Sequence, residues 1–138
     1  MEKTSLLLDV LQTKKNYEEV IETKPTFVNL TVSEYLNQLI ELRDLKKSEI
    51  ISQSGLERTY AYQIFSGIKT PTRDKLLALA MGMKLTFDEV QDLLKITNYA
   101  QLYAKKRRDN IIIFAFYKGQ NIWELNDNLL TMGEELIV

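Results

Sequence analysis

The chain has 138 residues, of which 45% are hydrophobic, and its formal net charge is −1. This length and composition fit a single compact domain with short appendages. The sequence contains neither cysteine nor histidine, which excludes disulfides, thiolate nucleophiles, imidazole bases and the usual zinc ligand sets. We therefore expect no enzyme activity, no cofactor and no metal site.

The apolar runs at residues 6–8 and 111–116 are too short for a signal-peptide core or a membrane span. We expect a cytoplasmic protein that does not associate with a membrane. Basic residues are concentrated in the middle of the chain, where the segment from Arg43 to Lys84 has eight basic and four acidic residues. Such an excess favours contact with phosphates, although solvated helix faces often carry a similar imbalance.

Apolar residues recur at three-to-four spacing along most of the chain, and only two prolines and five glycines interrupt it. This pattern predicts an all-α fold. A first helix is expected over residues 5–22, before Pro25. Thr31 and Glu34 form a capping-box pattern that opens a second helix over residues 32–45.

Further helices are expected at residues 47–54, 58–65, 71–83, 87–97 and 109–117, and after Asn121. Thr70 is the expected cap of the helix that Pro71 begins, and Asp109 is the expected cap of the helix over residues 109–117. The predicted organisation is an N-terminal helical extension (1–30), a five-helix core (31–98) and a C-terminal helical hairpin (99–138).

The helices at residues 47–54 and 58–65 have the features of a helix-turn-helix. Gly55 permits the positive φ that the intervening turn requires, and Gly67 ends the second helix. The apolar residues expected to hold the pair together are Ile50, Ile51, Leu56, Ala61 and Ile64. The second helix then has a polar outer face that can enter a major groove.

The stretch from Leu45 to Val90 resembles the lambda-repressor-like helix-turn-helix family of the Xre or Cro/C1 type, and the likeness extends over about residues 33–97. The residues that match the family pattern are Ile50, Ile51, Gly55, Leu56, Ile64, Gly67, Pro71, Leu76, Leu77, Ala80, Met83, Leu85 and Val90. The chain is also similar to small regulators of Gram-positive bacteria and their mobile elements. The resemblance implies binding to double-stranded DNA, commonly as a homodimer on a palindrome.

Three positions depart from the family pattern. Lys47 stands where a glutamine usually braces a phosphate, Phe65 stands where a glutamate is common, and Ala61 replaces a larger aliphatic residue. Lysine can still reach a phosphate, although without bidentate geometry. Phe65 and Ala61 are interpreted as a volume exchange within the core.

The residues expected to contact base edges are Arg58, Thr59, Tyr60, Tyr62 and Gln63. Gln63 can bridge N6 and N7 of adenine, and Arg58 can bind guanine or a phosphate. The residues expected to contact phosphates are Lys46, Lys47, Ser48, Lys69 and Thr72. The two tyrosines have ordinary packing against a neighbouring helix as an alternative role.

The C-terminal region leaves two alternatives open. The basic run at residues 105–108 is either a second phosphate patch or a set of salt-bridge partners. Ile112, Phe116 and Trp123 form either a dimer interface or part of the chain's own core. The leading hypothesis is a dimeric transcriptional regulator, and a repressor is preferred to an activator. The alternative is a protein-interaction module, antitoxin-like or similar to a phage-type inhibitor, which acts through the hairpin.

Overall fold

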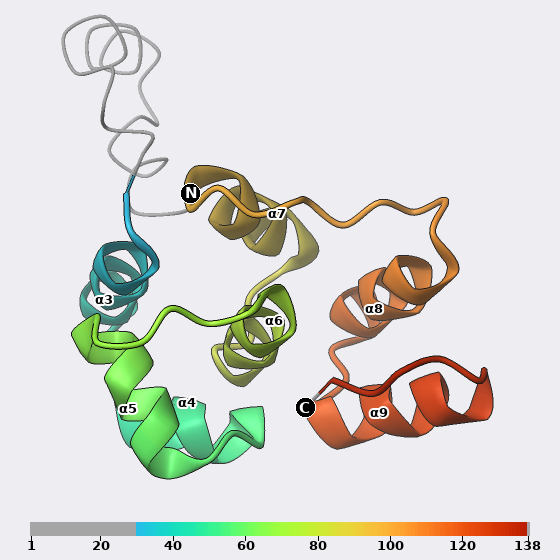
Figure 1. Cartoon of the computed structure of the whole chain (residues 1–138), viewed down its shortest axis with the longest axis horizontal. Helices are drawn as coiled ribbons and strands as arrows, with labels where there is room; N and C mark the ends of the chain where they lie inside the picture. Colours follow the sequence, from blue (N-terminus) through green and yellow to red (C-terminus); the bar gives the residue numbers. More distant parts are fainter. Residues whose placement is uncertain (1–29, 138) are drawn as a thin grey trace, which may run out of the picture.

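The structure, a computed structural model, describes residues 30–137, so the helix predicted at residues 5–22 lies outside the described residues. Within the described range every regular element is an α-helix, as predicted, and there is no strand (Figure 1). The helices are α3 (Val32–Arg43), α4 (Lys47–Ser54), α5 (Arg58–Ser66), α6 (Arg73–Gly82), α7 (Phe87–Ile96), α8 (Arg107–Lys118) and α9 (Ile122–Thr131). None of these seven helices is both long enough and apolar enough to cross a membrane.

Local capping explains why most of these helices begin where the sequence predicts. Complete capping boxes open α3, α7 and α9, and their residue pairs are Thr31 with Glu34, Thr86 with Glu89, and Asn121 with Glu124. Each box satisfies two backbone N–H groups that the first turn leaves unpaired. Gly55, Gly67 and Gly119 end helices in the left-handed conformation, with φ of 74°, 88° and 68°.

Two predicted caps are wrong. Thr72, rather than Thr70, caps α6, because its Oγ1 accepts a hydrogen bond of 3.2 Å from the Lys75 N–H and Pro71 lies before the helix. Helix α8 begins at Arg107, so Asp109 is already inside its first turn. The Asp109 carboxylate is turned inward to bind Arg73 and is not available to cap α8.

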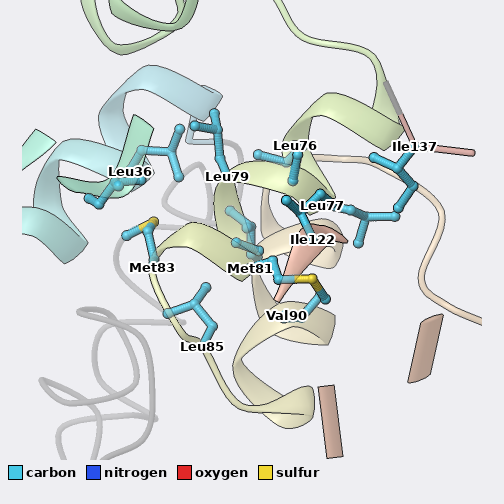
Figure 2. Packing of buried hydrophobic residues seen from close by; sticks show 14 of the residues in the cluster. Leu36, Leu76, Leu77, Leu79, Met81, Met83, Leu85, Val90, Ile122 and Ile137 are labelled. Carbon is cyan, nitrogen blue, oxygen red and sulfur yellow. The ribbon is translucent and has the colours of Figure 1, made fainter. Parts of the chain in front are cut away.

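Helix α6 forms the centre of the core, since its residues 76–82 are all buried. Its side chains gather with Leu36 of α3, Val90 of α7, Ile122 of α9 and the C-terminal Ile137 in one buried cluster (Figure 2). Helix α6 therefore links the other helices of the segment α3–α7 to the C-terminal hairpin.

Helices α4 and α6 approach each other most closely at Gly82. A Cβ atom at position 82 would lie 2.4 Å from the carbonyl oxygen of Ile50 and 3.2 Å from the backbone nitrogen of Ser54. Both atoms belong to the α4 backbone, which cannot move aside as a flexible side chain can. Glycine at position 82 thus sets the distance between the first helix of the predicted helix-turn-helix and the core.

Two reciprocal ion pairs dock the C-terminal hairpin, α8 and α9, against α6. Arg73 donates two hydrogen bonds, of 3.1 and 3.0 Å, to the carboxylate of Asp109. Arg108 donates two more, of 3.0 and 2.8 Å, to the carboxylate of Asp74. Neighbouring residues on α6 and neighbouring residues on α8 therefore exchange opposite charges in bidentate geometry, which fixes both distance and orientation.

The C-terminal tail closes over the hairpin. The Asn126 amide donates to the carbonyl oxygen of Ile137 at 2.9 Å and accepts from its N–H at 2.8 Å. Arg108 also donates from Nε to the carbonyl oxygen of Glu135. These contacts hold the Ile137 side chain in the core, where it is 3% exposed.

We expect Gly82→Ala to lower the free energy of unfolding by about 2 kcal/mol, because the added methyl group must displace the α4 backbone. Urea unfolding followed by circular dichroism measures this loss. Ser52→Ala is the control, since Ser52 is exposed on α4. Equal stability of the two variants would contradict the close approach at Gly82.

We expect Asp109→Asn to lower the free energy of unfolding at pH 7 by about 2 kcal/mol, because Arg73 loses a charged acceptor. Burial raises the pKa of the Asp109 carboxyl, but hydrogen bonds from Arg73 and the Tyr103 amide outweigh burial and leave the pKa below its ordinary value of 3.8. The carboxylate therefore stabilises the fold above the ordinary pKa, and this contribution is lost as the pH falls through the lowered value.

Urea unfolding of both proteins at a series of pH values measures the effect. The difference in the free energy of unfolding between the wild type and Asp109→Asn should be fully present at pH 7. It should shrink as the pH falls below the ordinary pKa of aspartate. A gap that does not change with pH would show that the Asp109 charge has no part in docking the hairpin.

Candidate nucleic-acid interface

Helix α5 presents one face to the core and leaves the opposite face to solvent. The preceding turn depends on Gly55, whose φ of 74° is in the left-handed region. Ala61, Ile64 and Phe65 anchor the helix, with exposed fractions of no more than 1%. Phe65 therefore fills core volume beside the small Ala61, as the sequence indicates.

Helix α3 holds the C-terminal end of α5 by two hydrogen bonds to one atom. The Ser33 hydroxyl donates to the carbonyl oxygen of Phe65 at 2.7 Å, and the Asn37 amide donates to the same oxygen at 2.8 Å. A carbonyl at a helix end has no partner within the helix. These bonds satisfy it and fix the direction of α5 relative to α3.

The outer face of α5 is hollowed, and we call this depression the α5 hollow. The residues that line it are Lys47, Arg58, Thr59, Tyr62, Gln63 and Ser66. Four of the five predicted base-contact residues thus come together with one predicted phosphate contact from α4. The Arg58 guanidinium lies 5.4 Å from the centre of the Tyr62 ring, and the Lys47 ammonium lies 5.6 Å from that of Phe65.

Tyr60 is separated from this group. It is half-buried and packs against the core, and the Lys75 ammonium of α6 lies 5.3 Å from the centre of its ring. The side of α5 that carries Tyr60 therefore faces α6, whereas Tyr62 lies in the α5 hollow. Packing against a neighbouring helix, the alternative role given for the two tyrosines, therefore describes the position of Tyr60.

The remaining predicted phosphate contacts lie outside the α5 hollow. Lys46 and Ser48 are exposed at the start of α4, and Lys69 is exposed in the loop after α5. Thr72 is also exposed, but its hydroxyl oxygen accepts the Lys75 N–H as the cap of α6. Lys46, Ser48 and Lys69 are therefore accessible to a large ligand that covers the α5 hollow.

Ion pairs neutralise part of the positive charge of the central segment. Arg43 pairs with Glu89 and Arg73 pairs with Asp109, so two of the eight basic residues are neutralised by acids from outside the segment. Of the other basic residues, Lys47 and Arg58 line the α5 hollow, whereas Lys46, Lys69 and Lys84 are exposed outside it. The α5 hollow therefore carries positive charge, although the charge of the segment is not confined to it.

Glu57, directly before α5, is a residue that the sequence analysis did not select. Its carboxylate caps α5, accepting the N–H of Tyr60 at 2.8 Å and that of Thr59 at 3.0 Å. These two hydrogen bonds hold the pKa of the exposed Glu57 carboxyl below its ordinary value of 4.5. Its position directly before the helix was the available signal, but glutamate is not among the preferred cap residues.

The C-terminal residues with two possible roles fall into two groups. Ile112 and Phe116 are buried in the core of the chain, whereas Trp123 is 52% exposed. Ile122 and Trp123 lie against the turn before α5, where a Cβ at Gly55 would be 3.4 Å from Ile122 Cγ2 and 3.9 Å from Trp123 Cζ2. The hairpin therefore contacts the turn that positions α5.

The basic run at residues 105–108 is partly used within the chain. Nε of Arg107 lies 3.7 Å from Oε2 of Glu134, and Arg108 binds Asp74 as described above. Lys105 and Lys106 remain exposed. The salt-bridge alternative therefore describes the two arginines of the run.

No family model, curated protein or solved structure matches the chain. Within residues 30–137, no three acidic side chains gather as a metal site requires. The α5 hollow instead offers a cluster of hydrogen-bond donors and acceptors around two cations, Lys47 and Arg58. Such a surface suits recognition of a polar, negatively charged ligand.

We expect the double substitution of Ser33→Ala and Asn37→Ala to lower the free energy of unfolding by about 2 kcal/mol, since both hydrogen bonds to Phe65 are lost. Relative to the wild type, amide hydrogen exchange should accelerate more in α5 than in α9. Asn128→Ala in the hairpin is the control, because its amide binds only Gln120 among the hydrogen bonds seen in the described residues. Uniform acceleration in all helices would contradict a specific role in holding α5.

Proposed function

We propose that the chain is a sequence-specific DNA-binding protein that places the outer face of α5 in a major groove. The observation that carries this proposal is the α5 hollow, in which Arg58, Thr59, Tyr62 and Gln63 converge with Lys47 of α4. An α-helix with its side chains is about 10–12 Å across, and a major groove about 12 Å wide admits such a helix.

The side chains divide by the chemistry that they can offer. Gln63 can form a bidentate contact with N6 and N7 of adenine, and Arg58 can do so with O6 and N7 of guanine. Lys47 and the exposed Lys46 and Lys69 are suited to phosphates, which position the helix without reading sequence. Tyr62 can pack its ring against a thymine methyl group.

The proposed architecture is a lambda-repressor-like core over residues 31–98, comprising α3–α7, with α8 and α9 as an added hairpin. The order of a short helix, a glycine turn and a second short helix, followed by the buried α6, supports this assignment.

We further propose that the protein acts as a homodimeric repressor on a palindrome. Trp123 provides an exposed aromatic residue for the dimer contact, whereas Ile112 and Phe116 are buried within the chain.

One observation favours a second candidate function, a protein-interaction module. The hairpin exposes several large apolar side chains, namely Phe114, Tyr117, Trp123 and Leu130. Exposed apolar residues of this size are common anchors of protein interfaces. In this alternative the hairpin binds a partner protein, and the α5 hollow makes no contact with DNA.

Binding to a duplex selected from random DNA, followed by fluorescence anisotropy, tests the proposal. About six phosphate contacts per dimer predict that the logarithm of the binding constant falls with the logarithm of salt concentration with a slope of about −5. Gln63→Ala should weaken binding to the selected duplex about tenfold, because it removes one bidentate base contact.

Gln53→Ala is the matched control, since Gln53 is an exposed glutamine on α4 that does not line the α5 hollow. It should bind the selected duplex as tightly as the wild type. Equal affinity of the Gln63 variant and the wild type would remove Gln63 from the interface. Failure of the wild type to retain any duplex at low salt would favour the protein-interaction module.

A further inference from the structure

We infer that Glu57 reads a cytosine at one position of each DNA half-site. This inference rests on the proposed function, because it requires α5 to lie in a major groove. Glu57 immediately precedes Arg58 and Thr59, which line the α5 hollow, and its side chain is exposed at the first turn of α5. It is thus placed at the end of the helix that enters a groove first in proteins of this architecture.

The Glu57 carboxylate determines which groups of the DNA the first turn of α5 can approach. The N–H groups of Thr59 and Tyr60, which would otherwise attract a phosphate, already donate to Glu57. The side chain adds a full negative charge at the same place. A DNA phosphate brought to this point would meet a like charge and would find both amides occupied. The first turn of α5 is therefore suited to base edges and unsuited to the phosphate backbone.

An ionised carboxylate can only accept hydrogen bonds, and its two oxygens offer about four lone-pair sites. The two backbone amides use one site on each oxygen, and the Thr59 side chain also hydrogen-bonds to the carboxylate. Since the side chain is exposed, the sites that these donors leave unused are open to a ligand. That ligand must present a hydrogen-bond donor.

The major groove contains only two such donors, the N4 amino group of cytosine and the N6 amino group of adenine. Adenine places its N7 acceptor beside the amino group, and this acceptor would face the carboxylate unfavourably. Cytosine has no acceptor of its own on that edge. The chemistry of Glu57 therefore selects cytosine over adenine and rejects guanine and thymine, which offer Glu57 no donor.

The amides that bind Glu57 also orient it. With each oxygen tied to a backbone N–H, the carboxylate keeps one orientation relative to α5 and needs no reordering when the groove is occupied. A side chain fixed in this way discriminates among bases better than a mobile one. Glu57 thus joins two roles, capping α5 and selecting a base, in one carboxylate.

Selection of duplexes from random DNA by the full-length chain, with sequencing of the bound fraction, tests this inference. The wild type should enrich cytosine about tenfold at one position of each half-site. Glu57→Ser keeps a side chain that can cap α5 but lacks the charge and the reach, so the preference at that position should disappear while the other positions stay unchanged. Glu57→Gln should shift the preference to adenine, the base that an amide pairs with.

Glu49→Gln is the control, because it removes an exposed carboxylate from α4 outside the α5 hollow, and it should leave every preference unaltered. A defined half-site without a cytosine preference, or one in which both Glu57 variants keep that preference, would overturn the inference and reduce Glu57 to a helix cap. Absence of any enriched sequence with the wild type would overturn the proposed function as well.

Discussion

The close approach of α4 to α6 at Gly82 is the constraint on which the geometry of this protein depends. A methyl group at this position would lie 2.4 Å from the Ile50 carbonyl oxygen, a separation that packed atoms do not tolerate. The α4 backbone therefore rests directly on the central helix. Because only a short turn at Gly55 joins α4 to α5, the position of α4 determines where α5 can lie.

Three further contacts complete the support of α5. Ser33 and Asn37 of α3 hold the carbonyl oxygen of Phe65 at one end, and Glu57 holds the amides at the other. Behind the turn, Ile122 of α9 packs against Gly55. The hairpin can provide this contact because the reciprocal ion pairs of α6 and α8 fix it in place. A surface that reads DNA needs this rigidity, since a loosely held helix loses discrimination as well as affinity.

The sequence predicted the parts of the fold that local chemistry determines. The capping box at Thr31 and the left-handed glycines Gly55 and Gly67 act within a few residues, so pattern reading found them. The prediction that Asp109 caps α8 failed because its partner, Arg73, is 36 positions away in the sequence. An acid beside the basic run at residues 105–108 gives no sign of which distant charge will bind it.

The same distinction applies to the candidate site. Spacing along a helix identified the outer face of α5, but it could not separate Tyr60, which packs beside Lys75, from Tyr62 in the α5 hollow. The division depends on which side of α5 lies next to Lys75 of α6. Glu57 was missed for another reason, since an acid within a basic segment was counted only as a reduction of charge. Its hydrogen bonds to α5 give it a position that composition does not reveal.

The most direct test of the account is nuclear magnetic resonance of the isotope-labelled full-length chain, titrated with duplex DNA at low salt. The account predicts that backbone amide shifts change in α5, at the start of α4 and in the loop around Lys69, while the amides of α8 and α9 change little. Shift changes confined to the hairpin, or none anywhere, would contradict the assignment of α5 as the surface that binds DNA.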